Sequence, residues 1–241
     1  MRQWNLRLSL YTINNAIGQL RWFNPQTGGY TYTPWNIDGN RGIQFTGNFN
    51  QAVDQEKRWY LSIGTDVKLD RSVDFANTDE SVDFHKSIVH NLHVSPNAGI
   101  DYRYAKWYAA FKMSADWERI TSAQKDFETL SQIDYLYTLR LKAPLPFEVD
   151  FNTDLNLFVR RGYSDRSMNT DEWVWNASLS RSLDGRKAWI VKLSAHDLLG
   201  QLSSVRRTLG AQGRVETVSN TLTRCVMLHL IWKFSRRPAG G

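Results

Sequence analysis

The stretch Phe147-Glu-Val-Asp-Phe-Asn-Thr-Asp-Leu-Asn-Leu-Phe-Val-Arg-Arg161 decides the fold class of this chain. From Phe147 to Val159 every second residue is apolar or threonine, and the residues between them are mostly acids and amides. A period of two is the pattern of a β-strand with one apolar and one polar face. A soluble sheet would need a second layer over the apolar face. In a membrane barrel, lipid covers that face and the polar face lines a wet lumen.

The same alternation repeats along the rest of the chain, and it predicts an all-β, antiparallel, up-and-down transmembrane barrel segment of about ten strands. The prolines interrupt the pattern, and we expect Pro34 to break the ladder and Pro96 to form a bulge, because proline has no N–H to donate. The other strands are expected at 4–23, 43–49, 59–69, 92–102, 107–117, 133–141, 173–179, 189–195 and 226–234.

The composition agrees with a barrel better than with a helical membrane protein. The hydrophobic fraction is 41%, the mean hydropathy is −0.48, and there is no run of eighteen apolar residues, which excludes a helical span. Barrel strands dilute the hydropathy signal, because only alternate residues meet lipid. Aromatic residues make up 13% of the chain and include ten tryptophans.

The distribution of charge and the spacing of the Cys, His and Ser residues give no sign of an enzyme's active site. The net charge is +6, but the basic residues are scattered, so we expect no nucleic-acid partner. The single Cys225 excludes an internal disulfide framework. The five histidines lack metal-ligand spacing, and no serine lies in a nucleophile elbow. We therefore expect no enzymatic activity, catalytic residue, cofactor or metal.

The predicted connections alternate in length, as in outer-membrane barrels with short periplasmic turns and long outer loops. Short turns are expected near residues 55, 105, 145 and 185, and long loops near 78, 124, 166 and 210, the first of them an acidic loop from Asp70 to about Lys86. Aromatic residues then gather at the short-turn end, where amphipathic rings suit a membrane interface. The predicted girdle comprises Trp4, Trp59, Trp107, Phe147, Trp189, Trp232 and Phe234, joined by Phe49 and Tyr102. An opposite girdle would hold Trp117, Tyr135, Trp173 and Trp175.

The acids of the deciding stretch face the lumen in this interpretation. Like charges two residues apart need counter-charges, so we expect them to pair with Arg140, Lys142 and Arg160. The predicted lumen-facing residues are Glu148, Asp150, Asn152, Asp154, Arg140, Lys192 and His229.

The end of the chain carries Asp197-Leu-Leu-Gly-Gln201, Arg206 with Arg207, and Leu222-Thr-Arg-Cys-Val-Met-Leu228 running to Phe234. These motifs resemble the closing segment of the outer-membrane β-barrel proteins related to TonB-dependent receptors. The family pattern has Asn where this chain has Gly200 and Tyr where it has Cys225. The resemblance implies the outer membrane of a Gram-negative cell, uptake of a ligand, contact with outer-membrane lipid, and a TonB-type energy system.

We expect residues 1–234 to form one barrel domain and 235–241 a flexible tail. No signal peptide precedes the first strand pattern, so we expect the C-terminal part of a larger barrel, with a plug domain and N-terminal strands missing and with unpaired first and last strands. One alternative is a complete ten-strand barrel acting as an adhesin or enzyme. Another is a soluble carbohydrate-binding β domain with exposed tryptophans.

Overall fold

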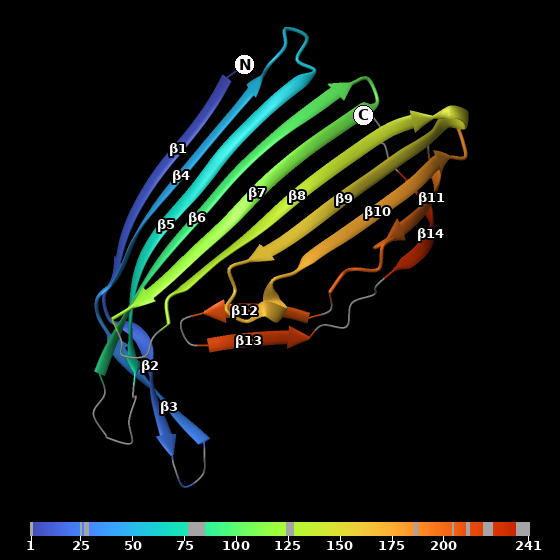
Figure 1. Ribbon diagram of the computed structural model, residues 1–241. Helices are drawn as coiled ribbons and strands as arrows, with labels where there is room; N and C mark the ends of the chain where they lie inside the picture. The colour runs from blue at the N-terminus through green and yellow to red at the C-terminus, as the bar shows by residue number, and fades with distance from the viewer. Residues whose placement is uncertain are drawn as a thin grey trace, which may run out of the picture.

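The computed structural model describes residues 2–24, 26, 29–76, 85–123, 128–185, 188–203, 205–210, 213–218 and 224–234. Its main feature is one antiparallel sheet of ten strands, in the order β1-β4-β5-β6-β7-β8-β9-β10-β11-β14 (Figure 1). The prediction of an all-β, antiparallel sheet of about ten strands is confirmed. The expected tail 235–241 lies outside the described residues.

The strands of this sheet are long, which suits the alternating pattern that specifies them. Their bounds are β1 Arg2–Ile13, β4 Asn40–Ala52, β5 Trp59–Ala76, β6 His85–Tyr104, β7 Trp107–Ser122, β8 Leu130–Leu145, β9 Val149–Arg161, β10 Asp171–Ser182, β11 Trp189–His196 and β14 Cys225–Trp232. Two separate hairpins lie at the lower end in Figure 1: β2 Ala16–Asn24 with β3 Gly29–Ile37, and β12 Val205–Gly210 with β13 Gly213–Val218.

The predictions for the first strand and for the long loop near residue 210 are wrong, because each region contains a hairpin. The first strand does not continue to Phe23, because β1 ends at Ile13 and Asn15 turns the chain with φ 54°. Asparagine tolerates this left-handed conformation better than most residues. Pro34 lies within β3, opposite Gln19, and does not break the ladder. In a two-stranded sheet one side of each strand is free, so a residue without an N–H is accepted there.

The predicted acidic loop from Asp70 to Lys86 is also wrong at both ends. Strand β5 continues to Ala76 and β6 begins at His85, with these two residues in register. Val73 and Phe75 continue the phase of Leu69, so the alternation itself extends beyond the predicted end of the strand. Residues 77–84, which connect the two strands, lie outside the described part of the chain.

The deciding stretch begins as a strand at Val149, two residues later than predicted. Residues Pro146–Glu148 form a short 3₁₀ turn, η1, in which Phe147 and Glu148 have φ of 63° and 59°. Leu145 pairs directly with Val149, so the turn consists of these three residues. Alternation of side-chain polarity carries no information on the sign of φ, which explains why the sequence pattern ran through the turn.

Pro96 does not form the predicted bulge. The ladder between β6 and β7 runs from Val89 opposite Ser122 to Tyr104 opposite Trp107. It is interrupted between the pair of Val94 with Trp117 and the pair of Asn97 with Ser114. The interruption takes two residues from each strand, so the register continues without an extra residue. A missing N–H removes one ladder bond, but a bulge also requires an inserted residue.

The short turns alternate with long connections, as predicted, and two of them are built alike. Asp54 accepts a hydrogen bond from the backbone N–H of Trp59 at 2.8 Å, and Asp184 accepts one from Trp189 at 2.9 Å. Both turns therefore follow the pattern Asp-x-x-Lys-x-Trp, which the sequence analysis did not detect. The N–H of Trp59, followed by that of Arg58, stabilises the carboxylate and lowers the pKa of Asp54.

The sheet is open. Strand β1 pairs with β4, strand β14 pairs with β11, and no ladder joins β1 to β14 in the sheet that the described residues form. The prediction of unpaired first and last strands is confirmed.

The sheet has no second layer over it within the described residues, and its buried apolar core is correspondingly small. The buried apolar residues are Ile37, Val73, Ala110, Ile120, Ala143, Tyr163, Met168 and Val174. Of the helices in the described part of the chain, none has the length and apolar character needed to cross a membrane.

Candidate functional site

The two faces of the sheet differ in polarity, as the alternation predicts. One face, which we call the apolar face, presents exposed hydrophobic side chains from β1 to β14. A directly paired row, Ile100, Phe111, Leu139, Leu155 and Trp175, crosses five neighbouring strands. Leu139 is 51% exposed and Leu228, on the last strand, is 75% exposed. Monomeric soluble proteins rarely leave so large a continuous apolar surface in water.

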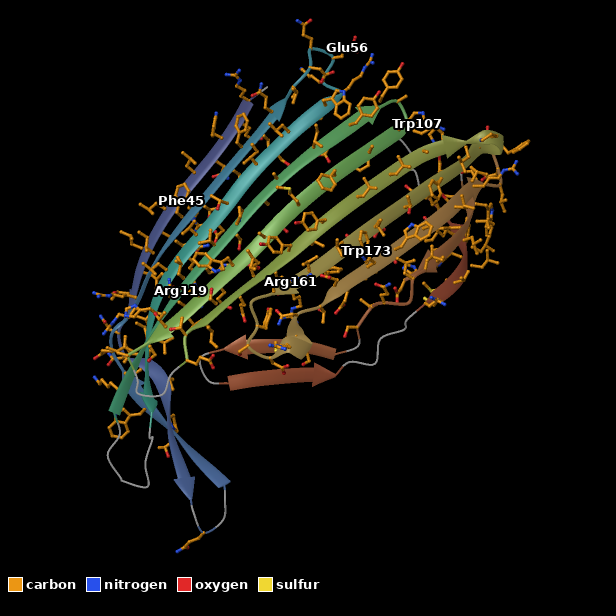
Figure 2. The ribbon with its side chains drawn as sticks, in the orientation of Figure 1. Phe45, Glu56, Trp107, Arg119, Arg161 and Trp173 are labelled. Carbon is orange, nitrogen blue, oxygen red and sulfur yellow. The ribbon has the colours of Figure 1, made fainter. Side chains whose placement is uncertain are left out.

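Aromatic residues form pairs at the short-turn end of the apolar face. Figure 2 shows Glu56 and Trp107 at this end and Arg119 and Arg161 at the other. The ring centroids are 4.2 Å apart for Trp4 and Phe49, 4.7 Å for Trp59 and Tyr102, 5.6 Å for Trp189 and Trp232, and 5.3 Å for Trp232 and Phe234. Phe147 lies in the η1 turn at the same end and is 82% exposed. The predicted girdle residues therefore share one end of the sheet.

The opposite aromatic group lies nearer the long connections. Trp117 is on β7, Tyr135 on β8, and Trp173 with Trp175 on β10. On β7, Trp107 and Trp117 are ten positions apart, which is about 34 Å along an antiparallel strand. At the tilt of about 40° that is usual in membrane barrels, this spacing corresponds to roughly 26 Å, close to their apolar band of about 25 Å.

Among the hollows of the described residues, two lie over strands of the other face, which we call the polar face. The larger, the basic hollow, lies over β8 to β11 and has a volume of about 390 Å³. It collects four of the predicted lumen-facing residues: Arg140, Asn152, Asp154 and Lys192. Its further polar lining consists of Lys142, Asn176, Ser178, Ser180, Ser194 and His196.

The predicted pairing of the acids with the bases in this region is wrong. Asp154 lies opposite Arg140 in register, yet its carboxylate accepts hydrogen bonds from the amides of Asn156 and Asn176, each at 2.9 Å. Arg160 pairs instead with Asp134. The two amide donors, one on the same strand and one on β10, satisfy the carboxylate without an ion pair. The sequence pattern cannot distinguish hydrogen bonding to amides from ion pairing with a base.

The remaining predicted lumen residues are not gathered in the basic hollow. Glu148 belongs to the η1 turn and is exposed, so its placement on a strand is wrong. Asp150 lies on β9 beside the hollow, opposite Ser180 and Pro144. His229 is adjacent to it on β14, with its Nε2 2.9 Å from the Oγ of Ser194.

The second, the acidic hollow, lies over β6 to β9 and has a volume of about 240 Å³. The sequence analysis did not single out its residues as a group. Asp116 and Asp134 face each other in register, and each has its own cationic or ionisable partner. Asp116 pairs with His93 and also accepts from Ser95 Oγ at 2.8 Å. Strand register would have revealed this group, because its members on the strands occupy the polar phase at two adjacent levels of neighbouring strands.

Glu118 is held by two amides in the same hollow. Asn91 Nδ2 donates to its carboxylate at 2.8 Å and Gln132 Nε2 at 2.9 Å. These bonds orient both amides, and the buried Oδ1 of Asn91 and Oε1 of Gln132 have no hydrogen-bond partner among the described residues. Such acceptors are costly to bury unpaired.

Tyr163, in the connection after β9, closes the acidic hollow. Its hydroxyl donates to Asp134 Oδ1 at 2.9 Å and accepts from Arg160 Nη2 at 2.8 Å. Burial raises the pKa of Tyr163 to about 12, and the carboxylate of Asp134 acts in the same direction, while Arg160 opposes both.

We expect Tyr163 to titrate near pH 12 in the folded protein, in contrast to about 10 for an exposed tyrosine. Below pH 10 its stabilising contribution is complete, and it is lost as the pH rises from 10 to 12, because the folded state then holds the proton more tightly. The measurement is a difference titration of tyrosinate absorbance between the wild type and Tyr163→Phe. A difference curve with a midpoint near 10 would contradict the assignment.

Asp197 fastens the exit of β11 to β10. Its side chain is 2% exposed, and it accepts the N–H groups of Gln201 and Leu202 at 3.0 and 3.1 Å. The segment also bonds to β10, since Leu198 N–H donates to the carbonyl of Trp175 at 2.8 Å and Gln201 Oε1 accepts from Trp173 N–H at 3.1 Å. The sequence analysis used this segment for its resemblance and missed its structural role.

The described residues contain no group of three or more His, Cys, Asp or Glu side chains that could hold a metal ion. No family model, curated protein or solved structure matches the chain.

Proposed function

We propose that this chain forms part of the wall of an outer-membrane β-barrel of the class related to TonB-dependent receptors, in a Gram-negative cell. The observation that carries the proposal is the exposed apolar face, bordered by aromatic residues at both ends and backed by a polar, hollowed face. In this setting lipid contacts the apolar face, and the polar face lines the lumen.

The free energy of burial favours this arrangement over a soluble one. Burying apolar surface contributes roughly 25 cal/mol per Å², and the described part of the chain has no second layer to do so. A soluble carbohydrate-binding domain would leave the whole apolar face in water. Placing the same apolar face in the hydrocarbon of a membrane carries no desolvation penalty. The tryptophan rings at its borders would then lie among the lipid headgroups.

The open edges support a larger barrel over a complete ten-strand one. Closure within this chain would require β1 to pair with β14, and the sheet does not contain that ladder. Unpaired backbone N–H and C=O groups in lipid cost several kcal/mol each. The proposal therefore includes further strands that close the barrel, supplied by an N-terminal portion. By the resemblance of the C-terminal segment, it also includes a plug domain within the barrel.

The geometry at Gly200 supports the resemblance of the C-terminal segment. Gly200 has φ 65°, and asparagine, which the family pattern has at this position, is among the side-chain-bearing residues that adopt this conformation most readily. By that resemblance the barrel takes up a ligand across the outer membrane, driven by a TonB-type energy system. The long connections and the polar face would supply its contacts with the ligand.

Cysteine labelling in whole cells tests the proposal. In a Cys225→Ser background of the full gene product, Leu139→Cys places a thiol on the apolar face and Arg140→Cys places one on the polar face of the same strand. We expect a lipid-soluble maleimide to label the first and a membrane-impermeant maleimide to label the second, with both proteins in the outer-membrane fraction. Equal labelling of both by the impermeant reagent would reject membrane insertion.

A further inference from the structure

The basic hollow has a surplus of positive charge that its neighbours do not neutralise. Its lining contains Arg140, Lys142 and Lys192 against one carboxylate, Asp154. That carboxylate already accepts from two amides, and none of the three cations makes an ion pair within 4 Å with a described residue. Lys142 contacts the ring of Tyr108, with its Nζ 5.7 Å from the ring centroid.

The arrangement of the three cations is fixed by strand pairing. Arg140 and Lys142 are two positions apart on β8, so they share the polar face. Asn152 of β9 lies opposite Lys142, and Ser178 of β10 lies opposite Asn152. Lys192 of β11 lies opposite Ser180. The hollow is therefore bordered by cations on its two sides, with amide and hydroxyl groups between them.

We infer that the basic hollow binds a multiply anionic ligand that also carries hydroxyl groups, such as an acidic oligosaccharide. Carboxylate or phosphate oxygens would meet the ammonium and guanidinium groups, and charge-assisted hydrogen bonds of this kind are about twice as strong as neutral ones. The hydroxyls of Ser178 and Ser180 can both donate and accept, which matches ligand hydroxyl groups. The amide of Asn152 adds a donor and an acceptor.

This inference rests on the proposed function for its setting, since the polar face is the lumen wall there. The acidic hollow does not compete for the same ligand. Its carboxylates Asp116, Glu118 and Asp134 have donors already, and they would repel an anion. The two hollows therefore divide the polar face into a region that attracts anions and a region that excludes them.

The test measures binding of trigalacturonate and of galactotriose, the same sugar without carboxylates, to the detergent-solubilised full gene product by calorimetry. At low salt we expect trigalacturonate to bind about tenfold or more tightly than galactotriose, and the preference to shrink as salt rises. The triple variant Arg140→Gln, Lys142→Gln, Lys192→Gln should lose the preference. Lys68→Gln, which removes a lysine of the polar face on β5, should retain it.

Three outcomes would overturn the inference: no preference in the wild type, an unchanged preference in the triple variant, or an equal loss in Lys68→Gln. If the triple variant fails to fold, each single variant should weaken trigalacturonate binding about two- to threefold. Unchanged binding in all three single variants would then also overturn the inference. Binding in detergent is independent of membrane location. A failed labelling test with an intact preference would reject the proposed function alone.

Discussion

Met113→Arg in the full gene product folded in lipid vesicles lowers the free energy of unfolding by about 2–4 kcal/mol, the cost of arginine on the lipid side near the middle of a barrel. Met113 is 47% exposed on the apolar face, between Trp107 and Trp117 on β7. It therefore lies away from both aromatic borders, and from this position a guanidinium group cannot easily reach the lipid headgroups. Denaturant unfolding followed by tryptophan fluorescence gives the measurement.

Ser114→Arg is the matched control, because Ser114 is the next residue of the same strand and lies on the polar face. Its neighbour on that face, Asp116, would accept the new charge, so we expect a change below about 1 kcal/mol. Equal destabilisation of the two variants would show that both faces meet the same environment. The assignment of the apolar face to lipid would then be wrong.

Asp197→Ala destabilises the full gene product by about 2–3 kcal/mol, because it removes two hydrogen bonds from backbone N–H groups to a buried carboxylate. The loss is expected to loosen the segment 197–202, which follows β11 and bonds to β10. Hydrogen exchange of the amides of Gln201 and Leu202 should rise together with the loss of global stability, measured by denaturant unfolding. Asp197→Asn should restore part of both, since its amide oxygen accepts one of the bonds.

Asp171→Ala provides the comparison for this second variant. Asp171 also carries a carboxylate close to the long connections, but it is exposed and pairs with Arg161 at 2.7 Å. Exposed ion pairs contribute about 0–1 kcal/mol, so the variant should be close to the wild type. A loss in Asp197→Ala no larger than in Asp171→Ala would mean that the carboxylate of Asp197 does not fasten the segment.

Several features of the fold could be predicted because they depend on local alternation. The side of the sheet that holds Leu139, Leu155 and Leu228 follows from a period of two, and each strand repeats that information independently. The aromatic border is equally readable, because a turn signal next to a tryptophan marks the strand end. The open edges were predicted from the expectation that the chain is part of a larger barrel, and the sheet confirms them.

Other features could not be predicted, because alternation is silent about them. The η1 turn depends on the left-handed conformation of Phe147 and Glu148, and neither residue is a typical turn former. The repeated pattern of Asp54 with Trp59 and Asp184 with Trp189 was visible in the sequence, yet its meaning required the hydrogen bonds.

The sequence by itself determined which side chains share a face, since a strand assigns alternate residues to opposite faces whatever its neighbours are. The tertiary structure decided which of them meet, because contact across strands depends on register. Register alone does not name the partner: Asp154 lies opposite Arg140, yet its carboxylate accepts from Asn156 on its own strand and from Asn176 on β10. Arg140 forms no ion pair with a described residue. A one-dimensional pattern fixes the face of each charge, and only the three-dimensional arrangement of the side chains on that face fixes its partner.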